Sequence, residues 1–209
     1  NAGGWQDTIG VMGGTTFTVD IYAVNVTDLD TWSFELAYDT AALRVGAVTE
    51  GPFLASEGGT TLFIPDTFTP GVAKANNTIS GSSAAQSPDG TGVIASISFT
   101  ALRDSGSATL DLRRADFWDH NNVAIVPTRR SGSVTFSLRG DFDADGKVDI
   151  ADLRLFRAAW GSSDGDGGYE ARFDLDGDGE IGYGDFMAFW RANPTPNVSW
   201  RAGDVTGDA

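Results

Sequence analysis

The feature that most constrains this chain is a twelve-residue acidic pattern that occurs twice, with its two copies 33 residues apart. In both copies aspartate occupies positions 1, 3, 5 and 12, glycine occupies position 6 and an aliphatic residue occupies position 8. Carboxylates this close together repel one another unless a hard cation lies between them. Alternate residues of a tightly turned loop can point their carboxylates inward around such a cation, while glycine supplies the bend.

The pattern therefore predicts two calcium-binding loops and at least two bound ions. Ca²⁺ prefers about six to eight oxygen ligands, which in such loops include a main-chain carbonyl at position 7. The expected ligands are Asp141, Asp143, Asp145, Lys147, Asp149 and Asp152 in the first loop, and Asp174, Asp176, Asp178, Glu180 and Asp185 in the second. Position 9 of the second loop is Gly182, so water is expected to fill that place. A solvated acidic linker, the alternative, requires neither the fixed spacing nor Val148 and Ile181 at position 8.

A third fragment of the same pattern lies at the end of the sequence. Asp204, Thr206 and Asp208 place oxygens at positions 1, 3 and 5, and the fragment begins 30 residues after the second loop. Two interpretations stay open: a third calcium loop cut short, or a degenerate remnant that packs Trp200 against a neighbour. The recurrence at the expected interval favours the first.

Residues 1–138 show a different pattern, in which apolar and polar residues alternate. Phe17, Val19, Ile21 and Ala23 form one such set. This period of two predicts strands with one buried face. Further strands are expected at 32–38, 42–48, 61–64, 72–80, 93–102, 108–112 and 134–138, separated by turn residues. Many short strands without helical periodicity predict an antiparallel β-sandwich.

Residues 139–209 are predicted to form a second, small all-α domain. A short amphipathic helix is expected after each acidic loop, at 150–161 with Leu153, Phe156 and Trp160 on one face, and at 185–193 with Phe186, Phe189 and Trp190. These aromatic faces are expected to pack on each other. Because the core of so small a domain is thin, metal binding is expected to supply much of its folding free energy.

Composition and missing motifs exclude several functions. The net charge is −15. Residues 1–138 contain 14 acidic and 7 basic residues, and residues 139–209 contain 15 acidic and 7 basic residues. Because both parts are acidic, nucleic acid is not expected as a partner. The chain has no cysteine, so thiol chemistry is excluded, and no apolar run could span a bilayer. No hydrolase, metalloprotease or P-loop motif is present, and the single His120 is expected to hydrogen-bond within a loop. The chain is therefore predicted not to be an enzyme.

Residues 6–138 resemble a cohesin module. The resemblance rests on strand patterns at 19–26, 32–39 and 92–99, and on the closing Gly132, Ser133 and Val134. It implies a jelly-roll sandwich with a flat face that receives a calcium-loaded partner module. In cohesins the strand that contains Trp32 belongs to the partner-binding sheet, which makes Glu35 and Asn77 candidate contact residues. An ordinary solvated sheet surface is the alternative.

Residues 139–193 resemble a dockerin, the module that cohesins bind. Position 12 is aspartate in both loops, where EF-hands favour glutamate, and no helix is expected before the first loop. Type I dockerins typically place a Ser/Thr pair at positions 10 and 11 for contact with the cohesin. The residues at the corresponding positions, and those expected to flank them, are Ile150, Ala151, Arg157, Tyr183, Gly184, Trp190 and Arg191. If the same surface is used it is therefore apolar; alternatively, Ile150 and Tyr183 pack within the domain.

These features together predict a secreted or cell-surface, non-catalytic protein that assembles through calcium-dependent cohesin–dockerin contacts. No signal peptide begins at Asn1, so a mature or excised fragment is expected. Because one chain would contain both a cohesin-like module and a module of the type that cohesins bind, copies of the chain could associate head to tail. Docking within one molecule is the other geometry. The alternative function is carbohydrate binding by the sandwich, with Trp5, Trp118 and Trp200 stacking on polysaccharide.

Overall fold

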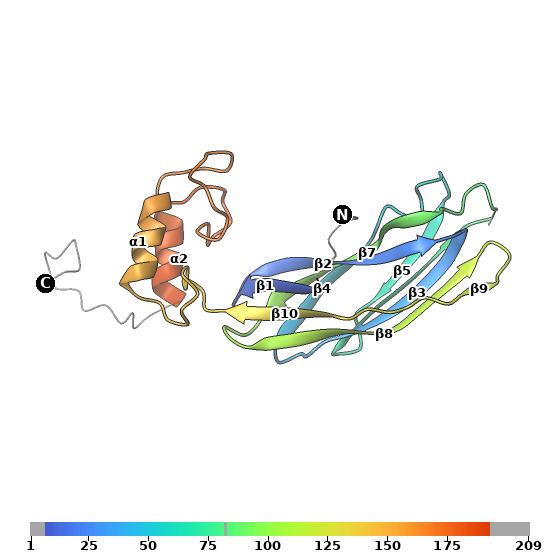
Figure 1. The fold of residues 1–209 in the computed structure, drawn as a ribbon, viewed down its shortest axis with the longest axis horizontal. Coiled ribbons are helices and arrows are strands. Elements are labelled where there is room, and N and C mark those ends of the chain that lie inside the picture. The colour runs from blue at the N-terminus through green and yellow to red at the C-terminus, as the bar shows by residue number, and fades with distance from the viewer. Residues whose placement is uncertain (1–6, 82, 193–209) are drawn as a thin grey trace, which may run out of the picture. The chain divides into compact units, whose positions relative to one another are not determined.

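The computed structural model describes residues 7–81 and 83–192. The chain divides into two compact units, residues 1–136 and 137–209. Figure 1 shows a β-sandwich in the first unit and two neighbouring helices in the second. The mainly β fold with a small helical part at its C-terminal side is therefore confirmed.

Two sheets form the first unit within the described residues. The larger has the strand order β1-β10-β8-β3-β6-β5, with β9 beside β8, and the smaller has the order β2-β7-β4. The strands are β1 (Thr8–Met12), β2 (Thr16–Val26), β3 (Leu29–Ala37), β4 (Leu43–Glu50), β5 (Thr61–Asp66), β6 (Val72–Ile79), β7 (Gly90–Ala101), β8 (Ser107–Asp119), β9 (Ala124–Ile125) and β10 (Gly132–Ser137). The register of β3 against both β6 and β8 is antiparallel, as the sequence predicts.

Alternation along β3 places the aromatic residues in the core. Trp32 and Phe34 are almost fully buried, and their rings stack with centroids 5.8 Å apart. Phe99 of β7 is also fully buried in the opposite sheet, where its ring lies 6.0 Å from that of Phe17. Burial of such large apolar side chains is the main favourable contribution to folding of a sandwich.

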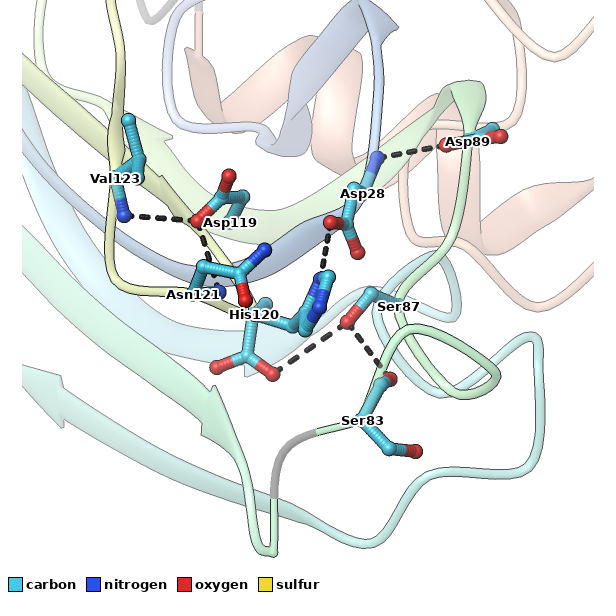
Figure 2. A network of polar contacts seen from close by, with 9 residues as sticks. Asp28, Ser83, Ser87, Asp89, Asp119, His120, Asn121 and Val123 are labelled. Atoms are coloured by element: carbon cyan, nitrogen blue, oxygen red, sulfur yellow. Dashed lines mark hydrogen bonds and ion pairs between the residues drawn. The ribbon is translucent and has the colours of Figure 1, made fainter.

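The prediction missed two strands, β1 and β9, and placed the end of β8 too early. Because β8 continues to Asp119, His120 lies in the tight turn between β8 and β9 (Figure 2). Its Nδ1 contacts the Asp28 carboxylate, and Asp119 accepts hydrogen bonds from the amides of Asn121 at 2.9 Å and Val123 at 2.8 Å. The expected loop hydrogen bond of His120 is confirmed, and it ties this turn to the β2–β3 connection.

The second unit contains α1 (Ile150–Ala159) and α2 (Tyr183–Ala192), close to the predicted ranges. Four phenylalanines form its core, with ring centroids 4.8 to 6.4 Å apart: Phe142, Phe156, Phe173 and Phe189. Phe156 and Phe189 bring the two helices together, as predicted. Trp160 follows the last helical residue and is 49% exposed, but its ring packs edge-on against that of Phe156, with centroids 5.6 Å apart, at the border of this core.

Within the described residues, neither helix is long and apolar enough to cross a membrane.

Candidate metal centres and docking surfaces

The second acidic loop brings four carboxylates together. Asp174, Asp176, Asp178 and Asp185 each offer an oxygen that lies within 4.8 Å of the others. The turn is held by the Asp174 carboxylate, which accepts hydrogen bonds from the amides of Gly177 at 2.7 Å and Gly179 at 3.0 Å. Gly179 has a φ of 86°, a left-handed conformation that favours glycine, which explains the requirement at position 6.

The first loop repeats this arrangement with three carboxylates. Asp141, Asp143 and Asp145 offer oxygens that lie within 4.8 Å of one another. Asp141 accepts a hydrogen bond from the amide of Gly146 at 2.9 Å, and Gly146 has a φ of 85°. The two loops therefore have the same internal hydrogen bonds at positions 1 and 6.

Among the described acidic residues of the second unit, the position-12 aspartates are the most buried, each with 1% exposure. Asp152 accepts hydrogen bonds from the amides of Phe142 at 2.6 Å and Asp149 at 2.8 Å. In the second loop, Asp185 accepts from Leu175 at 2.6 Å and Gly182 at 2.7 Å. Each of these carboxylates thus joins the start of its loop to the start of its helix.

Asp149, a predicted ligand at position 9, acts in the structure as the N-cap of α1. Its carboxylate accepts a hydrogen bond from the amide of Ala151 at 2.8 Å, and a capping box with Asp152 is present. It is not among the three clustered carboxylates of its loop. Gly182 at the matching place provides no side-chain cap. The two helices therefore begin differently.

The position-7 residues add little side-chain chemistry to the loops. The side chains of Lys147 and Glu180 are exposed, and their amides donate to Asp145 and Asp178 at 2.8 and 2.9 Å. A lysine ammonium has no lone pair to offer, so only the main-chain carbonyl at position 7 suits a cation. Asp204, Thr206 and Asp208 lie outside the described residues.

The loop carboxylates differ in proton affinity. Burial, with a further contribution from neighbouring carboxylates, raises the pKa of Asp143 and of Asp176. Burial also acts to raise the pKa of Asp174. The Tyr169 hydroxyl, which donates to Asp174 Oδ2 at 2.8 Å, and the main-chain amides outweigh that effect and hold the Asp174 pKa below its usual value. The same hydrogen bond raises the pKa of Tyr169 to about 12.

This donor set fits calcium. All clustered side-chain ligands are carboxylate oxygens, which suit hard cations, and main-chain amides fix their orientation. After burial, the charges of neighbouring carboxylates also contribute to the raised pKa values of Asp143 and Asp176. A divalent cation would compensate for the repulsion between these charges.

The predicted docking residues on the helices are mostly accessible. Tyr183 is 69% exposed and Trp190 is 39% exposed. With Trp160 and the half-buried Phe186 they form a continuous aromatic ridge, in which neighbouring ring centroids are 6.4 to 6.5 Å apart. Arg157 and Arg191 are exposed, while Ile150 and Ala151 are half-buried. The aromatic ridge thus lies mainly on the second repeat.

On the sandwich, one of the two predicted contact residues is misplaced. Glu35 points outward and forms an ion pair with Lys74 at 3.4 Å. Asn77 is paired with Trp32 across β3 and β6, so it points into the core; it is 1% exposed and its amide donates to Glu50 at 2.7 Å. The prediction that Asn77 lies on the contact face was therefore wrong.

The sequence analysis did not identify two exposed apolar residues on the outward side of this sheet. Leu62 is 57% exposed and Ile64 is 48% exposed, both on the edge strand β5. They are paired with Thr78 and Asn76 of β6, which places them on the outward side of the sheet. Alternation around Phe63 could have indicated this. We call the outward side of β8, β3, β6 and β5 the outer face.

Of the tryptophans proposed for carbohydrate stacking, the structure describes Trp118. Trp118 is half-buried on β8, opposite Thr31 of β3. Trp5 and Trp200 lie outside the described residues.

Comparison with known proteins places both units in families. The family profile of the cohesin domain matches residues 7–136, and that of the dockerin type I domain matches residues 139–192. No curated protein sequence matches the chain.

Solved structures of similar fold are cohesins. A non-cellulosomal cohesin from Archaeoglobus fulgidus is 15% identical, with a TM-score of 0.54, and the match covers 65% of this chain and 90% of that one. A cohesin from Clostridium acetobutylicum is 20% identical, with a TM-score of 0.53, over 62% and 86%. The sixth cohesin of Acetivibrio cellulolyticus scaffoldin B, solved in complex with a Cel5 dockerin, is 19% identical, with a TM-score of 0.51, over 63% and 95%. The chain therefore belongs to the cohesin family and joins its cohesin domain to a dockerin type I domain, both of them non-catalytic protein–protein interaction modules.

Proposed function

We propose that this chain is a calcium-dependent assembly protein whose dockerin domain docks on the outer face of the cohesin domain of a second copy. The observation that carries the proposal is the presence of both interaction modules in one chain. The solved complex of an Acetivibrio cellulolyticus cohesin with a dockerin supports pairing between these two module types. Because each copy would use one surface to bind and the other to be bound, assembly would proceed head to tail.

Calcium is proposed at both described loops, held by the clustered carboxylates of Asp141, Asp143 and Asp145 and of Asp174, Asp176, Asp178 and Asp185. When bound, the ion supplies positive charge that compensates for carboxylate repulsion. The main-chain hydrogen bonds to Asp152 and Asp185 support the proposal, because they connect each loop to the first turn of its helix. An ordered loop thereby fixes the direction of the helix that carries the docking residues.

Two complementary surfaces support the choice of partner. The aromatic ridge offers exposed apolar area, with Arg191 beside Trp190. The outer face offers the exposed Leu62 and Ile64, with the carboxylate of Glu35 two strands away. Buried aromatic and arginine residues commonly dominate the binding energy of protein interfaces. We therefore propose that Trp190 and Tyr183 pack against the β5 side of the outer face.

The proposed setting is extracellular. Cohesin and dockerin modules are typical of secreted cellulosome components. Outside cells calcium is abundant enough to fill even weak sites, since extracellular modules bind it with Kd values as high as about 10⁻³ M.

Sedimentation velocity of the full chain over a wide concentration range tests the proposal. In calcium the sedimentation coefficient should rise with concentration, and in chelator it should not. Ile64→Asp and Trp190→Ala should each weaken association by roughly tenfold or more, because each removes an apolar side chain that the proposed interface buries. The matched control is Val24→Asp, since Val24 is 46% exposed on a strand of the other sheet, close to the 48% of Ile64.

A monomer at every concentration, both in calcium and in chelator, would refute association between copies. Equal weakening by Val24→Asp and Ile64→Asp would refute the assignment of the contact to the outer face.

A further inference from the structure

Two arginines connect the two acidic loops in a reciprocal way. Arg139 lies two residues before Asp141, and Arg172 lies two residues before Asp174. Arg172 Nη1 donates a hydrogen bond to the carbonyl of Phe142 at 2.9 Å. Arg139 Nη2 donates to the carbonyl of Leu175. Each arginine therefore reaches from the entry of its own loop to the main chain of the other loop.

The carbonyls that accept these bonds belong to equivalent residues. Phe142 and Leu175 both occupy position 2 of a loop, and the amide of each donates to the position-12 aspartate of its own loop at 2.6 Å. Both side chains are buried, at 4% and 7% exposure. The residue at position 2 is thus bonded through its N–H to its own loop and through its C=O to the arginine of the other.

The contact with Arg172 continues into the second loop through the core. The Arg172 guanidinium lies 4.6 Å from the centre of the Phe173 ring, which is 4.8 Å from that of Phe142. Phe173 directly precedes Asp174, the first carboxylate of the second loop. Contacts therefore run from Asp152 through Phe142 and Arg172 to Phe173, which is joined along the chain to Asp174.

We propose that Arg139 and Arg172 are positioning residues that make calcium binding at the two loops positively cooperative. Ordering one loop fixes its position-2 carbonyl, which in turn holds the arginine at the entry of the other loop. The second loop then loses less conformational freedom when it orders, so its affinity rises. By linkage the effect is equal in both directions, so filling either loop should raise the affinity of the other by the same factor. The inference rests on the calcium binding proposed above.

The test measures the affinity of one loop while the other is weakened, in the full chain. The amide resonances of Gly146 and Gly179 report the first and second loop separately during a calcium titration. Asp176→Asn, an isosteric change, weakens the second loop. It should also lower the affinity of the first loop by about fivefold or more, within the usual range of coupling between sites. Hydrogen exchange of the Phe142 amide should accelerate in the same variant.

The same comparison is then made in an Arg139→Met, Arg172→Met background, which keeps the aliphatic stems but removes the donors. There Asp176→Asn should change the first-loop affinity by less than about twofold, because the coupling is lost. A background with lysine at both positions keeps a donor and should restore part of the coupling. Arg154→Met, which removes an exposed arginine of α1, is the matched control and should leave the coupling intact.

The outcomes separate this inference from the proposed function. If both loops bind calcium and the coupling is the same in the methionine background as in the natural sequence, the inference is overturned while calcium binding stands. If neither loop binds calcium, the proposed function and the inference fail together. Circular dichroism in saturating calcium checks that the double methionine variant retains its helices. If it does not, the coupling is measured in the single variants Arg139→Met and Arg172→Met instead.

Discussion

The two units of this chain both have an apolar core, but they differ in the charge that they bury. The most deeply buried side chains of the sandwich are apolar, among them Trp32, Phe34 and Phe99. In the second unit, two of the most deeply buried side chains are carboxylates, Asp152 and Asp185. Apolar burial stabilises a fold without any ligand, whereas buried like charges need compensation. The sandwich should therefore be indifferent to calcium, and the second unit should depend on it.

The largest expected effect is that of calcium removal. In chelator the helical signal of α1 and α2 should be lost, because each loop filled at a hundred times its Kd contributes about 2.7 kcal/mol to the folded state. The unfolding transition of the sandwich should not move. Far-ultraviolet circular dichroism and hydrogen exchange, in calcium and in chelator, measure the two units separately. Helices that stay fully protected in chelator would remove the contrast between the units.

A substitution in the core of the sandwich should affect the first unit and leave the second unchanged. Trp32→Ala should destabilise the first unit by about 3–5 kcal/mol, because it removes a fully buried side chain and leaves a cavity. Calcium stoichiometry and affinity should stay the same. Denaturant unfolding combined with a calcium titration tests both statements, and reduced calcium binding in this variant would show that the units depend on each other.

A smaller effect is expected where the two repeats differ at position 9. Asp149→Ala should cost about 1 kcal/mol, because the N-cap of α1 is lost. Gly182→Asp should stabilise the second repeat by a similar amount, since a Cβ at Gly182 meets nothing within 4 Å and the new carboxylate could cap α2. Thermal unfolding in calcium measures both changes. Destabilisation by Gly182→Asp would show that the start of α2 does not tolerate a cap.

The smallest expected effect is a dependence on pH in metal-free protein. The pKa values of Asp143 and Asp176 are raised in the folded state, so their contribution to stability is present below the usual value of 3.8 and is lost as pH rises through the folded values. Asp174, with a lowered pKa, acts in the opposite direction. Because two of these carboxylates have raised pKa values and one has a lowered value, the ion-free second unit should gain slightly in helicity as pH falls through the folded pKa values of Asp143 and Asp176 toward 3.8. Circular dichroism of calcium-stripped protein measures this, and a loss of helicity over that range would contradict it.

The acidic loops could be predicted because their chemistry is local in sequence. Ligand spacing, the glycine at position 6 and the helix after each loop all follow from neighbouring residues. The edge strands could not be predicted in the same way. β1 has only five residues, and it is fixed by contacts with a distant segment, such as that between the hydroxyls of Thr8 and Ser133 at 2.8 Å.

The docking surfaces illustrate a second limit. Alternation along β6 places Ala73, Ala75, Asn77 and Ile79 on one side, so the register predicts an inward Asn77, whereas its placement on the outer face came from family resemblance. Conversely, Leu62 and Ile64 alternate with Phe63, but only the sheet order shows which side is open. The sequence shows that Arg139 and Arg172 stand at equivalent positions, two residues before their loops, but only the fold shows that each reaches the main chain of the other loop.

Calcium stoichiometry tests the central claim most directly. The full chain, Asp141→Ala and Asp174→Ala are each titrated with calcium by calorimetry after removal of bound metal. The natural sequence should bind at least two ions, and each variant should lose one site and retain the other. Unchanged stoichiometry in both variants would contradict the assignment of the two loops as calcium sites.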